Sequence, residues 1–411
     1  MFKKSKLSGA LAFVLSACLA AACFAGCSDA SETSGKGESM SVSDGANTAS
    51  AETASKKNMN EMRDMTTADI VKDMGLGINL GNTFESSGIR VSSVQEYETA
   101  WGSPVITKEM IQGYKDAGFD SLRIPVAWSN MMQARTYEIS SEYIDRVKEV
   151  VEWALDSDLY VIMNIHWDGG WFSDFADDSQ RERCFKKYET IWTQLSAEFG
   201  EYGDKLIFES LNEEGGWEDI WNRYTGQGDK EKSFGILNDI NQKFVDIVRG
   251  SGGNNEKRHL LIAGYNTDIE LTCDELYKMP DDPAGRCAVS VHYYVPSTFA
   301  ILTKDADWGK ARSDWGTEAD IAELNKYMDM MKTNYVDKGI PVIIGEYGCP
   351  DEKENKDIES VRKYVSSVCE AAYTRGMCPM LWDITDHFYN RNEAKFRDEE
   401  LLKEIMAVKE K

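Results

Sequence analysis

Eight short apolar segments recur along this chain, and longer amphipathic stretches separate them. Each segment has the length and composition of a buried β-strand. The eight predicted strands are Gly75–Leu80, Asp120–Val126, Leu159–His166, Leu206–Asn212, His259–Tyr265, Ala288–Tyr294, Pro341–Glu346 and Pro379–Asp383. A strand and a helix that alternate in this way favour a parallel sheet covered by helices.

The stretches between the strands predict helices. Ser141–Asp158 repeats apolar residues every three or four positions, and Phe234–Gly253 and Glu359–Gly376 do the same. The second of these ends in glycines, a common helix stop signal. Eight strand and helix units without a glycine-rich phosphate loop favour an α/β fold of the closed (β/α)8 TIM-barrel type over an open doubly wound sheet.

Two of the predicted strands lead into a glutamate. Glu213 directly follows the fourth strand, and Glu346 closes the seventh. Active sites of such barrels lie at the C-terminal ends of the strands, so the two carboxyls can meet although they are far apart in sequence. Two carboxyls across a cleft suit cleavage of a glycosidic bond, because one must donate a proton and the other must attack or activate water.

Further polar and aromatic residues fall at the same ends of the predicted strands. One such residue would mean little, but groups of this kind at seven strand ends predict a site. Tyr294 is preferred to Tyr293, because neighbours along a strand point to opposite faces. The group consists of Asn79, Asn82, Glu85, Arg123, His166, Trp167, Asn212, His292, Tyr294 and Trp382.

The pattern of residues 1–60 does not predict strands or helices of the barrel. Residues 1–27 combine a basic start with an apolar run of small residues, the pattern of an export signal. The run ends at FAGCSD, which predicts a bacterial lipoprotein with Cys27 as the lipidated residue; an ordinary cleaved signal is the alternative. Residues 28–60 are rich in Ser, Thr and Ala and predict a flexible linker. The single catalytic domain is then 61–411, outside the cell and anchored to the membrane.

Charge and cysteine content exclude several function classes. The net charge of −24 argues against binding to nucleic acid and favours a neutral substrate. No CxxC spacing suggests a zinc knuckle, and a Cys273–Cys287 disulfide is conceivable, although scattered buried thiols fit equally well. We expect a monomer without cofactor or metal, since His166 and His292 lack a neighbouring carboxylate ligand set. The acidic tract Asp351–Asp357 is predicted to be a solvated loop.

Several short motifs stand in a characteristic order. Together they resemble glycoside hydrolase family 5, the large family of retaining cellulases, over Gly75 to Asp383. Each motif is weak alone, and the ordered set is specific. The motifs are NLGNT (Asn79–Thr83) with Trp101-Gly102, GFDSLRIPVAW (Gly118–Trp128), NIHWDGGW (Asn164–Trp171), LNE (Leu211–Glu213), HYY (His292–Tyr294), GEYG (Gly345–Gly348) and LWD (Leu381–Asp383).

The resemblance implies roles for the central residues. Glu213 would be the general acid/base and Glu346 the nucleophile. Arg123 and Tyr294 would hydrogen-bond the nucleophile and hold it ionised, because a guanidinium neighbour lowers the pKa of a carboxyl. Asn212 would contact the 2-hydroxyl of the sugar.

Other residues would bind substrate. The resemblance implies that His166 and His292 shape the cleavage subsite and that Trp382 lies beneath the distorted sugar. Asn79 is assigned to substrate binding as well.

Three tryptophans in glycine-rich or charged loops are further candidates for sugar platforms. They are Trp171, Trp217 and Trp308. Tryptophan also fills protein cores, which is the alternative for each of them.

The chain departs from the family pattern at Glu214, where a proline usually follows the acid/base. We expect Glu214 to be a solvent-facing loop residue. The alternative is that its carboxylate influences the neighbouring acid or binds substrate.

These observations predict a secreted, retaining endo-β-glycanase that hydrolyses β-1,4-glucan by double displacement. Xyloglucanase, lichenase and β-mannanase activities remain alternatives, since such enzymes share a catalytic set and differ in loop shape. A non-catalytic glycan-binding surface lipoprotein and a metal-dependent barrel hydrolase are alternatives of other classes.

Overall fold

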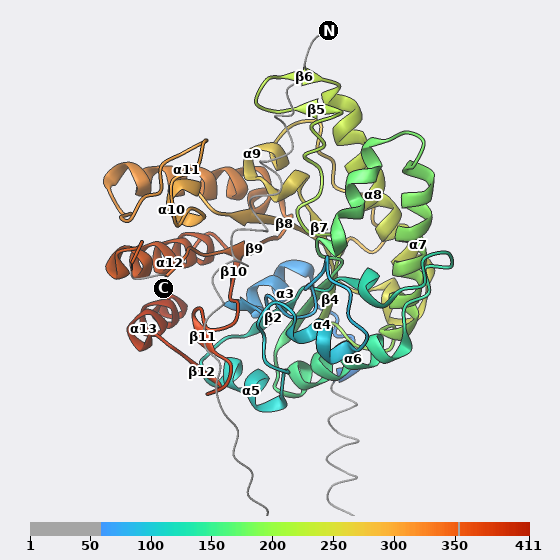
Figure 1. Cartoon of the computed structure of the whole chain (residues 1–411), viewed down its shortest axis with the longest axis horizontal. Helices are drawn as coiled ribbons and strands as arrows, with labels where there is room; N and C mark the ends of the chain where they lie inside the picture. Colours follow the sequence, from blue (N-terminus) through green and yellow to red (C-terminus); the bar gives the residue numbers. More distant parts are fainter. Residues whose placement is uncertain (1–58, 352–353) are drawn as a thin grey trace, which may run out of the picture.

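The computed structural model describes residues 59–351 and 354–411 (Figure 1). Eight parallel strands form a closed barrel in the order β1-β10-β9-β8-β7-β4-β3-β2. The barrel strands are β1 (Gly77–Asn79), β2 (Ser121–Ile124), β3 (Tyr160–Asn164), β4 (Leu206–Glu209), β7 (Leu260–Ala263), β8 (Cys287–Tyr293), β9 (Val342–Tyr347) and β10 (Cys378–Leu381). The predicted (β/α)8 barrel is confirmed: no barrel strand extends more than one residue beyond its predicted segment, and several are shorter.

Helices surround the barrel on its outside (Figure 1). The longer ones are α5 (Lys108–Asp116), α6 (Ser141–Asp156), α7 (Arg181–Glu198), α8 (Lys230–Gly250), α11 (Glu318–Asn334), α12 (Ile358–Tyr373) and α13 (Glu399–Ala407). The short ones are α3 (Thr67–Asp73), α4 (Val94–Thr99), α9 (Ile269–Thr272) and α10 (Ser297–Ala300). The three predicted helices are present as α6, α8 and α12. Helix α8 begins earlier than predicted, because the side chain of Asp229 accepts from the Lys232 amide and caps a charged first turn.

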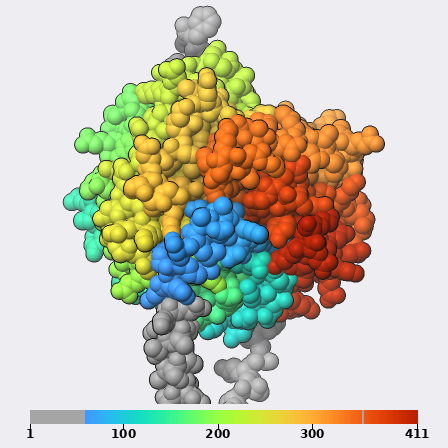
Figure 2. Space-filling view, turned by 180° about the vertical axis from the view of Figure 1, so that it is seen from behind, coloured from blue at the N-terminus to red at the C-terminus, as the bar shows by residue number. Residues whose placement is uncertain are grey.

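Helix α3 closes the N-terminal end of the barrel. Its apolar residues pack against the inward-facing side chains of the strands in a separate core cluster. In the rear view, the start of the described chain lies across the middle of this face (Figure 2). The cluster contains Ile70, Val71, Met74, Tyr160, Ile162, Ile207, Leu261, Ala288, Ile343, Cys378 and Met380. The barrel therefore has a packed floor, and its open end lies at the C-terminal strand ends.

Two antiparallel hairpins extend the connections. The first pairs β5 (Trp221–Asn222) with β6 (Gln227–Gly228), between β4 and α8. The second pairs β11 (Tyr389–Asn390) with β12 (Lys395–Phe396), after β10. Since the first follows a barrel strand directly, it belongs to the C-terminal face.

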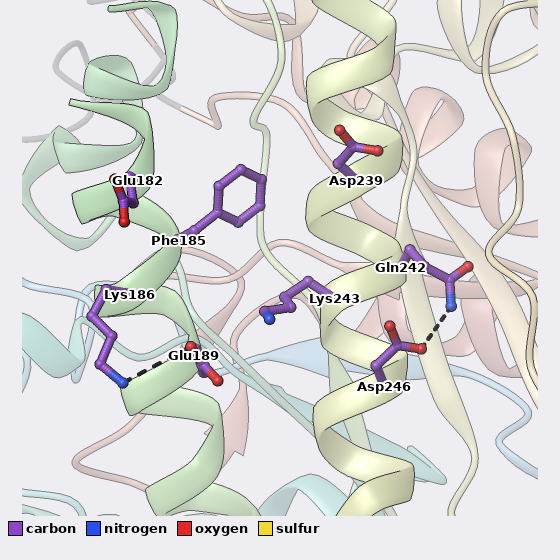
Figure 3. Close-up of a pocket in the computed structure, with 8 residues that line it drawn as sticks. All are labelled: Glu182, Phe185, Lys186, Glu189, Asp239, Gln242, Lys243 and Asp246. Carbon is purple, nitrogen blue, oxygen red and sulfur yellow. Dashed lines mark hydrogen bonds and ion pairs between the residues drawn. The ribbon is translucent and has the colours of Figure 1, made fainter. Parts of the chain in front are cut away.

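The helical wall is polar on its outside. A groove of about 470 Å³ separates α7 from α8 (Figure 3). On one side of it Lys186 pairs with Glu189 along α7 at 3.9 Å, and on the other Gln242 donates to Asp246 along α8 at 2.9 Å. These are ordinary contacts between surface side chains of one helix, so the groove does not gather reactive groups.

The predicted export signal, Cys27 and residues 28–58 of the linker lie outside the described residues. Met59 and Asn60 already contact the barrel: the Met59 carbonyl accepts from the Gly203 amide at 2.7 Å, and the Asn60 carbonyl accepts from the Asn254 side chain at 3.3 Å. None of the described helices combines the length and apolarity needed to cross a bilayer.

The six cysteines of the described chain are all free, so the conceivable bridge between Cys273 and Cys287 is absent. Burial raises the pKa of the Cys273 thiol to about 11. Both side chains are only partly buried, and each contacts a different neighbour, Met331 and Asp282 respectively.

The acidic tract Asp351–Asp357 is not wholly a solvated loop. Lys356 is buried, and its Nζ donates to the carbonyls of Phe299, Leu302 and Arg312, each at 2.7 Å. The prediction of a solvated loop is therefore wrong for Lys356, whose hydrogen bonds connect the segment after β8 to the start of α12.

Arg258, just before β7, connects the start of that strand to the segment that leads into β4. It is fully buried, and its guanidinium donates to one side chain and several backbone carbonyls. The acceptors are the carbonyls of Phe199, Gly200, Tyr202, Gly203 and Leu206 and the Asn255 side chain.

We predict that Arg258→Met lowers the free energy of unfolding by roughly 3 kcal/mol, because buried carbonyls lose their donors. Denaturant unfolding followed by tryptophan fluorescence measures the change. Arg183→Met is the matched control: Arg183 pairs with Asp174 on the surface, and its loss should change stability by less than about 1 kcal/mol. Equal effects of the two substitutions would contradict the prediction.

Candidate active site

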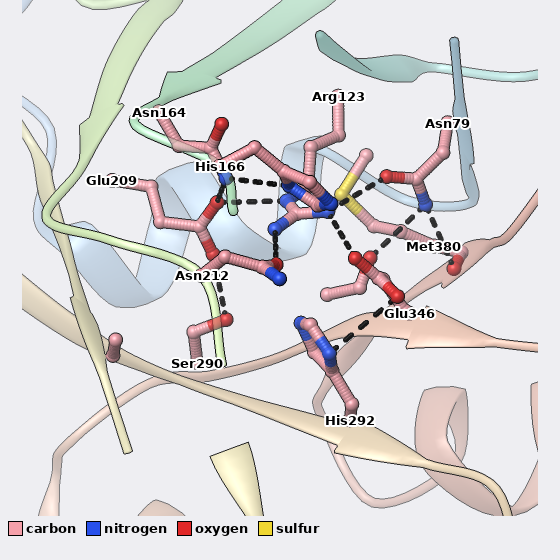
Figure 4. Close-up of polar contacts among 12 residues, drawn as sticks. Asn79, Arg123, Asn164, His166, Glu209, Asn212, Ser290, His292, Glu346 and Met380 are labelled. Atoms are coloured by element: carbon pink, nitrogen blue, oxygen red, sulfur yellow. Dashed lines mark hydrogen bonds and ion pairs between the residues drawn. The ribbon is translucent and has the colours of Figure 1, made fainter. Parts of the chain in front are cut away.

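Arg123, on β2, is the centre of a polar network at the C-terminal end of the barrel (Figure 4). The side chain is fully buried. Its Nη1 donates to Glu346 at 2.7 Å and to Asn79 at 3.1 Å, and its Nη2 donates to Asn212 at 2.9 Å. Its Nε donates to Glu209 at 2.7 Å. One guanidinium thus fixes side chains from β1, β4, β9 and the loop after β4.

Glu346, on β9, is a buried carboxylate held from several sides. One oxygen accepts from Arg123, and the other accepts from the Tyr294 hydroxyl at 3.0 Å. The Nδ1 of His292 lies 3.6 Å from this second oxygen, Oε2 of Glu346. Burial raises the pKa of Glu346 above its ordinary value, although His292 and Arg123 oppose this effect. The expected lowering by Arg123 is present, and desolvation outweighs it.

Glu213 faces this carboxylate and is more open to solvent. Its side chain is 30% exposed, and one oxygen lies 2.7 Å from Nδ1 of His292. One atom each of Glu213, His292 and Glu346 lie within 4.8 Å of one another. Carboxyls about 5 Å apart are typical of retaining glycosidases, whereas inverting enzymes need roughly 6.5–9.5 Å.

The same three atoms could in principle ligate a cation. The Arg123 guanidinium contacts Glu346 at 2.7 Å, however, and a second positive charge beside it would be repelled. The donor set therefore suits proton transfer better than metal binding.

His166 and Trp382 stand beside this pair. Their rings are parallel, with an interplanar angle of 7° and centroids 5.9 Å apart. Burial, with Arg123 and His292, holds the pKa of His166 well below its ordinary value, so its ring is neutral. A neutral imidazole and a half-buried indole offer a sugar one polar and one flat apolar surface.

Asn79 does not lie where a sugar could reach it. It is fully buried, and its Nδ2 donates to the carbonyls of Gly345, Met380 and Leu381 at 3.0–3.3 Å. Its oxygen accepts from Arg123. The substrate-binding assignment is therefore corrected: Asn79 orients Arg123.

The three loop tryptophans differ in exposure. Trp217 is only 6% exposed, and its Nε1 donates to the Phe172 carbonyl, so the structure contradicts its assignment as a sugar platform. Trp171 is half-buried, stacks on Phe172 and donates to Asp168 at 2.6 Å. Trp308 is 38% exposed and presents the most open ring of the three.

Glu209, the last residue of β4, is a site residue that was not predicted from the sequence. This residue is fully buried and accepts from Arg123, from Asn164 at 3.0 Å and from Ser290 at 2.8 Å. One signal for it was present in the sequence: a glutamate ends the apolar run LIFE of a predicted buried strand. Because charged groups are almost never fully buried unless paired, such a glutamate indicates a buried partner.

Glu214 is half-buried and not the solvent-facing residue that we expected. Burial raises its pKa to about 8, and the charges of Glu213 and Asp168 add to the effect. The environment of Glu214 therefore favours the protonated form of its carboxyl, directly beside the acid/base candidate.

Comparison with known proteins decides the family. A model of the cellulase family (glycosyl hydrolase family 5) matches residues 82–388. The chain belongs to glycoside hydrolase family 5. This confirms the resemblance inferred from the ordered motifs.

Individual relatives extend the family match. Endoglucanase A of Ruminococcus albus is 37% identical over 336 residues, which cover 81% of this chain and 87% of the relative. A xyloglucan-specific endo-β-1,4-glucanase of Bacteroides ovatus is 33% identical over 352 residues, covering 81% of this chain and 68% of the relative. A family 5 lichenase variant from Caldicellulosiruptor sp., solved with cellotetraose, superposes with a TM-score of 0.77 at 32% identity and covers 85% of this chain and 96% of that one.

The different surroundings of Trp382 and Trp217 predict different effects of substitution. Trp382→Ala should lower kcat/KM on the order of tenfold on a soluble β-glucan, because we expect the half-buried ring of Trp382 to contact the sugar. Trp217→Ala should instead lower the free energy of unfolding by about 3–5 kcal/mol, because it leaves a cavity. Steady-state kinetics and denaturant unfolding of both variants measure the effects, and a pure stability loss in Trp382→Ala would contradict its role.

Proposed function

We propose that the chain is a retaining endo-β-1,4-glucanase that hydrolyses β-glucan by double displacement. One observation carries the proposal: Glu346, buried and held by Arg123 and Tyr294, faces the more exposed Glu213 within 4.8 Å. This spacing leaves no room for a water between the carboxyls and favours direct attack by one of them.

In the first step an oxygen of Glu346 attacks the anomeric carbon while the bond from that carbon to the leaving oxygen breaks. Glu213 gives its proton to the leaving oxygen, and a glycosyl ester of Glu346 forms. In the second step Glu213, now a carboxylate, takes a proton from water, whose oxygen attacks the anomeric carbon. The ester bond breaks, Glu346 returns as a carboxylate, and the product keeps the β-configuration.

Neighbouring side chains assist both steps. His292 lies within hydrogen-bonding distance of Glu213 and can stabilise either of its protonation states by donating or accepting at Nδ1. Burial and the charge of Glu346 raise the pKa of Tyr294 well above its ordinary value, so its hydroxyl remains a donor to the nucleophile. The oxygen of Asn212 is held by Arg123, which leaves its NH₂ group to donate to the 2-hydroxyl of the sugar.

The exposure of the aromatic side chains suggests which of them bind the other parts of the sugar chain. Trp382 and His166 would line the cleavage subsite, with the indole beneath the sugar ring. Trp308, and the half-buried Trp171 to a lesser extent, would bind more distant sugars of the polymer.

The relatives support a β-glucan substrate. They are named as an endoglucanase, a xyloglucan-specific endo-β-1,4-glucanase and a lichenase. We therefore place unbranched β-1,4-glucan first and xyloglucan and mixed-linkage glucan next. β-Mannan, which the sequence patterns left open, gains no support from these names.

We further propose that the enzyme acts outside the cell as a monomer, anchored to the membrane through a lipid on Cys27. The basic and apolar pattern of residues 1–27 and the polar composition of residues 28–60 support this location. The alternative of a non-catalytic glycan-binding lipoprotein is disfavoured because both carboxyls are present and correctly spaced.

The test is hydrolysis of cellulose derivatives, mixed-linkage glucan, xyloglucan and mannan by the wild type, with product anomers followed by NMR. Glu213→Gln and Glu346→Gln should each lower kcat by about 10²–10⁴ or more, because proton transfer or the nucleophile is lost. Glu393→Gln, on a surface pair with Lys395, is the matched control and should leave activity unchanged.

Initial release of the α-anomer, or full activity of either catalytic variant, would overturn the mechanism. Activity on mannan without activity on any β-glucan would overturn only the substrate.

The elevated pKa of Glu346 gives a prediction for pH dependence. Attack requires the ionised carboxylate, so kcat/KM should fall as the pH drops through this pKa. Since burial raises this pKa, the acid limb should lie above the pH at which an exposed glutamate ionises. A pH profile of kcat/KM on an aryl β-cellobioside measures it, and an acid limb below that value would contradict the prediction.

A further inference from the structure

Arg123 contacts a second buried carboxylate besides the nucleophile. Its Nε donates to Glu209 at 2.7 Å, and its Nη1 donates to Glu346 at the same distance. The side chains of Arg123 and Glu209 are fully buried, and that of Glu346 is 7% exposed. Figure 4 shows the guanidinium between the two carboxylates.

The three groups carry one positive and two negative charges in the free enzyme. Glu346 therefore does not have to neutralise Arg123 alone. A carboxylate that is the sole partner of a buried guanidinium is strongly held in its charged state, which lowers its readiness to form a covalent bond.

The balance changes when the glycosyl ester forms. Glu346 then loses its negative charge, and Arg123 would be left as an uncompensated buried cation if it had no other partner. With Glu209 in place, the guanidinium keeps an ion pair throughout the reaction. An unpaired buried charge is among the costliest arrangements in a protein interior.

We propose that Glu209 is a positioning residue that acts through Arg123: it supplies the permanent counter-charge that lets Glu346 become neutral in the glycosyl-enzyme. This inference rests on the proposed double-displacement function and deepens it. Glu209 itself does not touch substrate, because Arg123, Asn164 and Ser290 enclose its carboxylate.

The contacts of Glu209 make one substitution especially clean. Its Oε2 accepts from Arg123 and Asn164, and its Oε1 accepts from the Ser290 hydroxyl. In Glu209→Gln the amide oxygen can accept the first two bonds, and its NH₂ can donate to Ser290, since a hydroxyl also accepts. The variant thus removes the charge and can keep all three contacts, although the hydrogen bond with Ser290 changes direction.

The acid limb of kcat/KM reports ionisation of the nucleophile. The charged or titratable groups around Glu346 come from several elements. They are Arg123 on β2, Glu213 after β4, His292 on β8 and Tyr294 directly after it, with Glu209 behind Arg123. Only Glu209 is changed in the proposed Glu209→Gln variant.

The experiment compares pH profiles of kcat/KM for wild type and Glu209→Gln on an aryl β-cellobioside. Loss of the second carboxylate strengthens the pairing of Arg123 with Glu346, so the acid limb should move about one pH unit lower. The plateau should fall by roughly tenfold or more, because the ester leaves an unpaired cation. An acid limb at the wild-type position would overturn the proposal, even if the plateau fell.

Ser290→Ala is the matched control, because it deletes a hydrogen bond to Glu209 and keeps the charge. Its acid limb should stay at the wild-type position, and a shift equal to that of Glu209→Gln would overturn a role through charge. Should Glu209→Gln not fold, Glu209→Asp replaces it: the shorter carboxylate pairs more weakly with Arg123, so the limb should move lower by a smaller amount, and no movement would overturn the proposal.

The proposed function and the role of Glu209 are contradicted by different results. A wild-type protein that hydrolyses no glycan would remove the proposed function. An active wild type whose profile is insensitive to the charge at position 209 would remove only the role of Glu209.

Discussion

The active site depends on the ion pairs that Arg123 makes inside the barrel. A fully buried guanidinium needs protein groups that accept its hydrogen bonds and balance its charge. The partners of Arg123 are Glu209, Glu346, Asn79 and Asn212. These partners come from different strands, so the geometry of the site is set by closure of the barrel. Catalytic placement and fold stability are consequently served by the same contacts.

The fold could be predicted almost completely because the barrel strands are short, apolar and separated by amphipathic helices. The errors concern polar segments, whose structure depends on distant partners. Helix α8 starts with a charged turn that only its Asp229 cap reveals. Lys356 looked solvated in sequence, yet it donates to three backbone carbonyls of the connection between β8 and α11. Local composition cannot indicate such long-range partners.

The residues proposed to be catalytic were recognisable because they fall at strand ends within ordered motifs, and the structure brings Glu213, His292 and Glu346 together. Their supporting residues were harder to assign. Asn79 and Trp217 have the residue types of sugar-binding groups, and only burial shows that they act inside the protein. Glu209 was overlooked because it lies within an apolar strand and its partner, Arg123, lies 86 positions earlier.

The floor formed by α3 bears on how a polymer can be cut. Because Ile70, Val71 and Met74 fill the lower mouth of the barrel, no glycan chain can thread through it. A polysaccharide can therefore reach Glu213 and Glu346 only from the C-terminal ends of the strands, and the loops at that end decide which part of the polymer is cut.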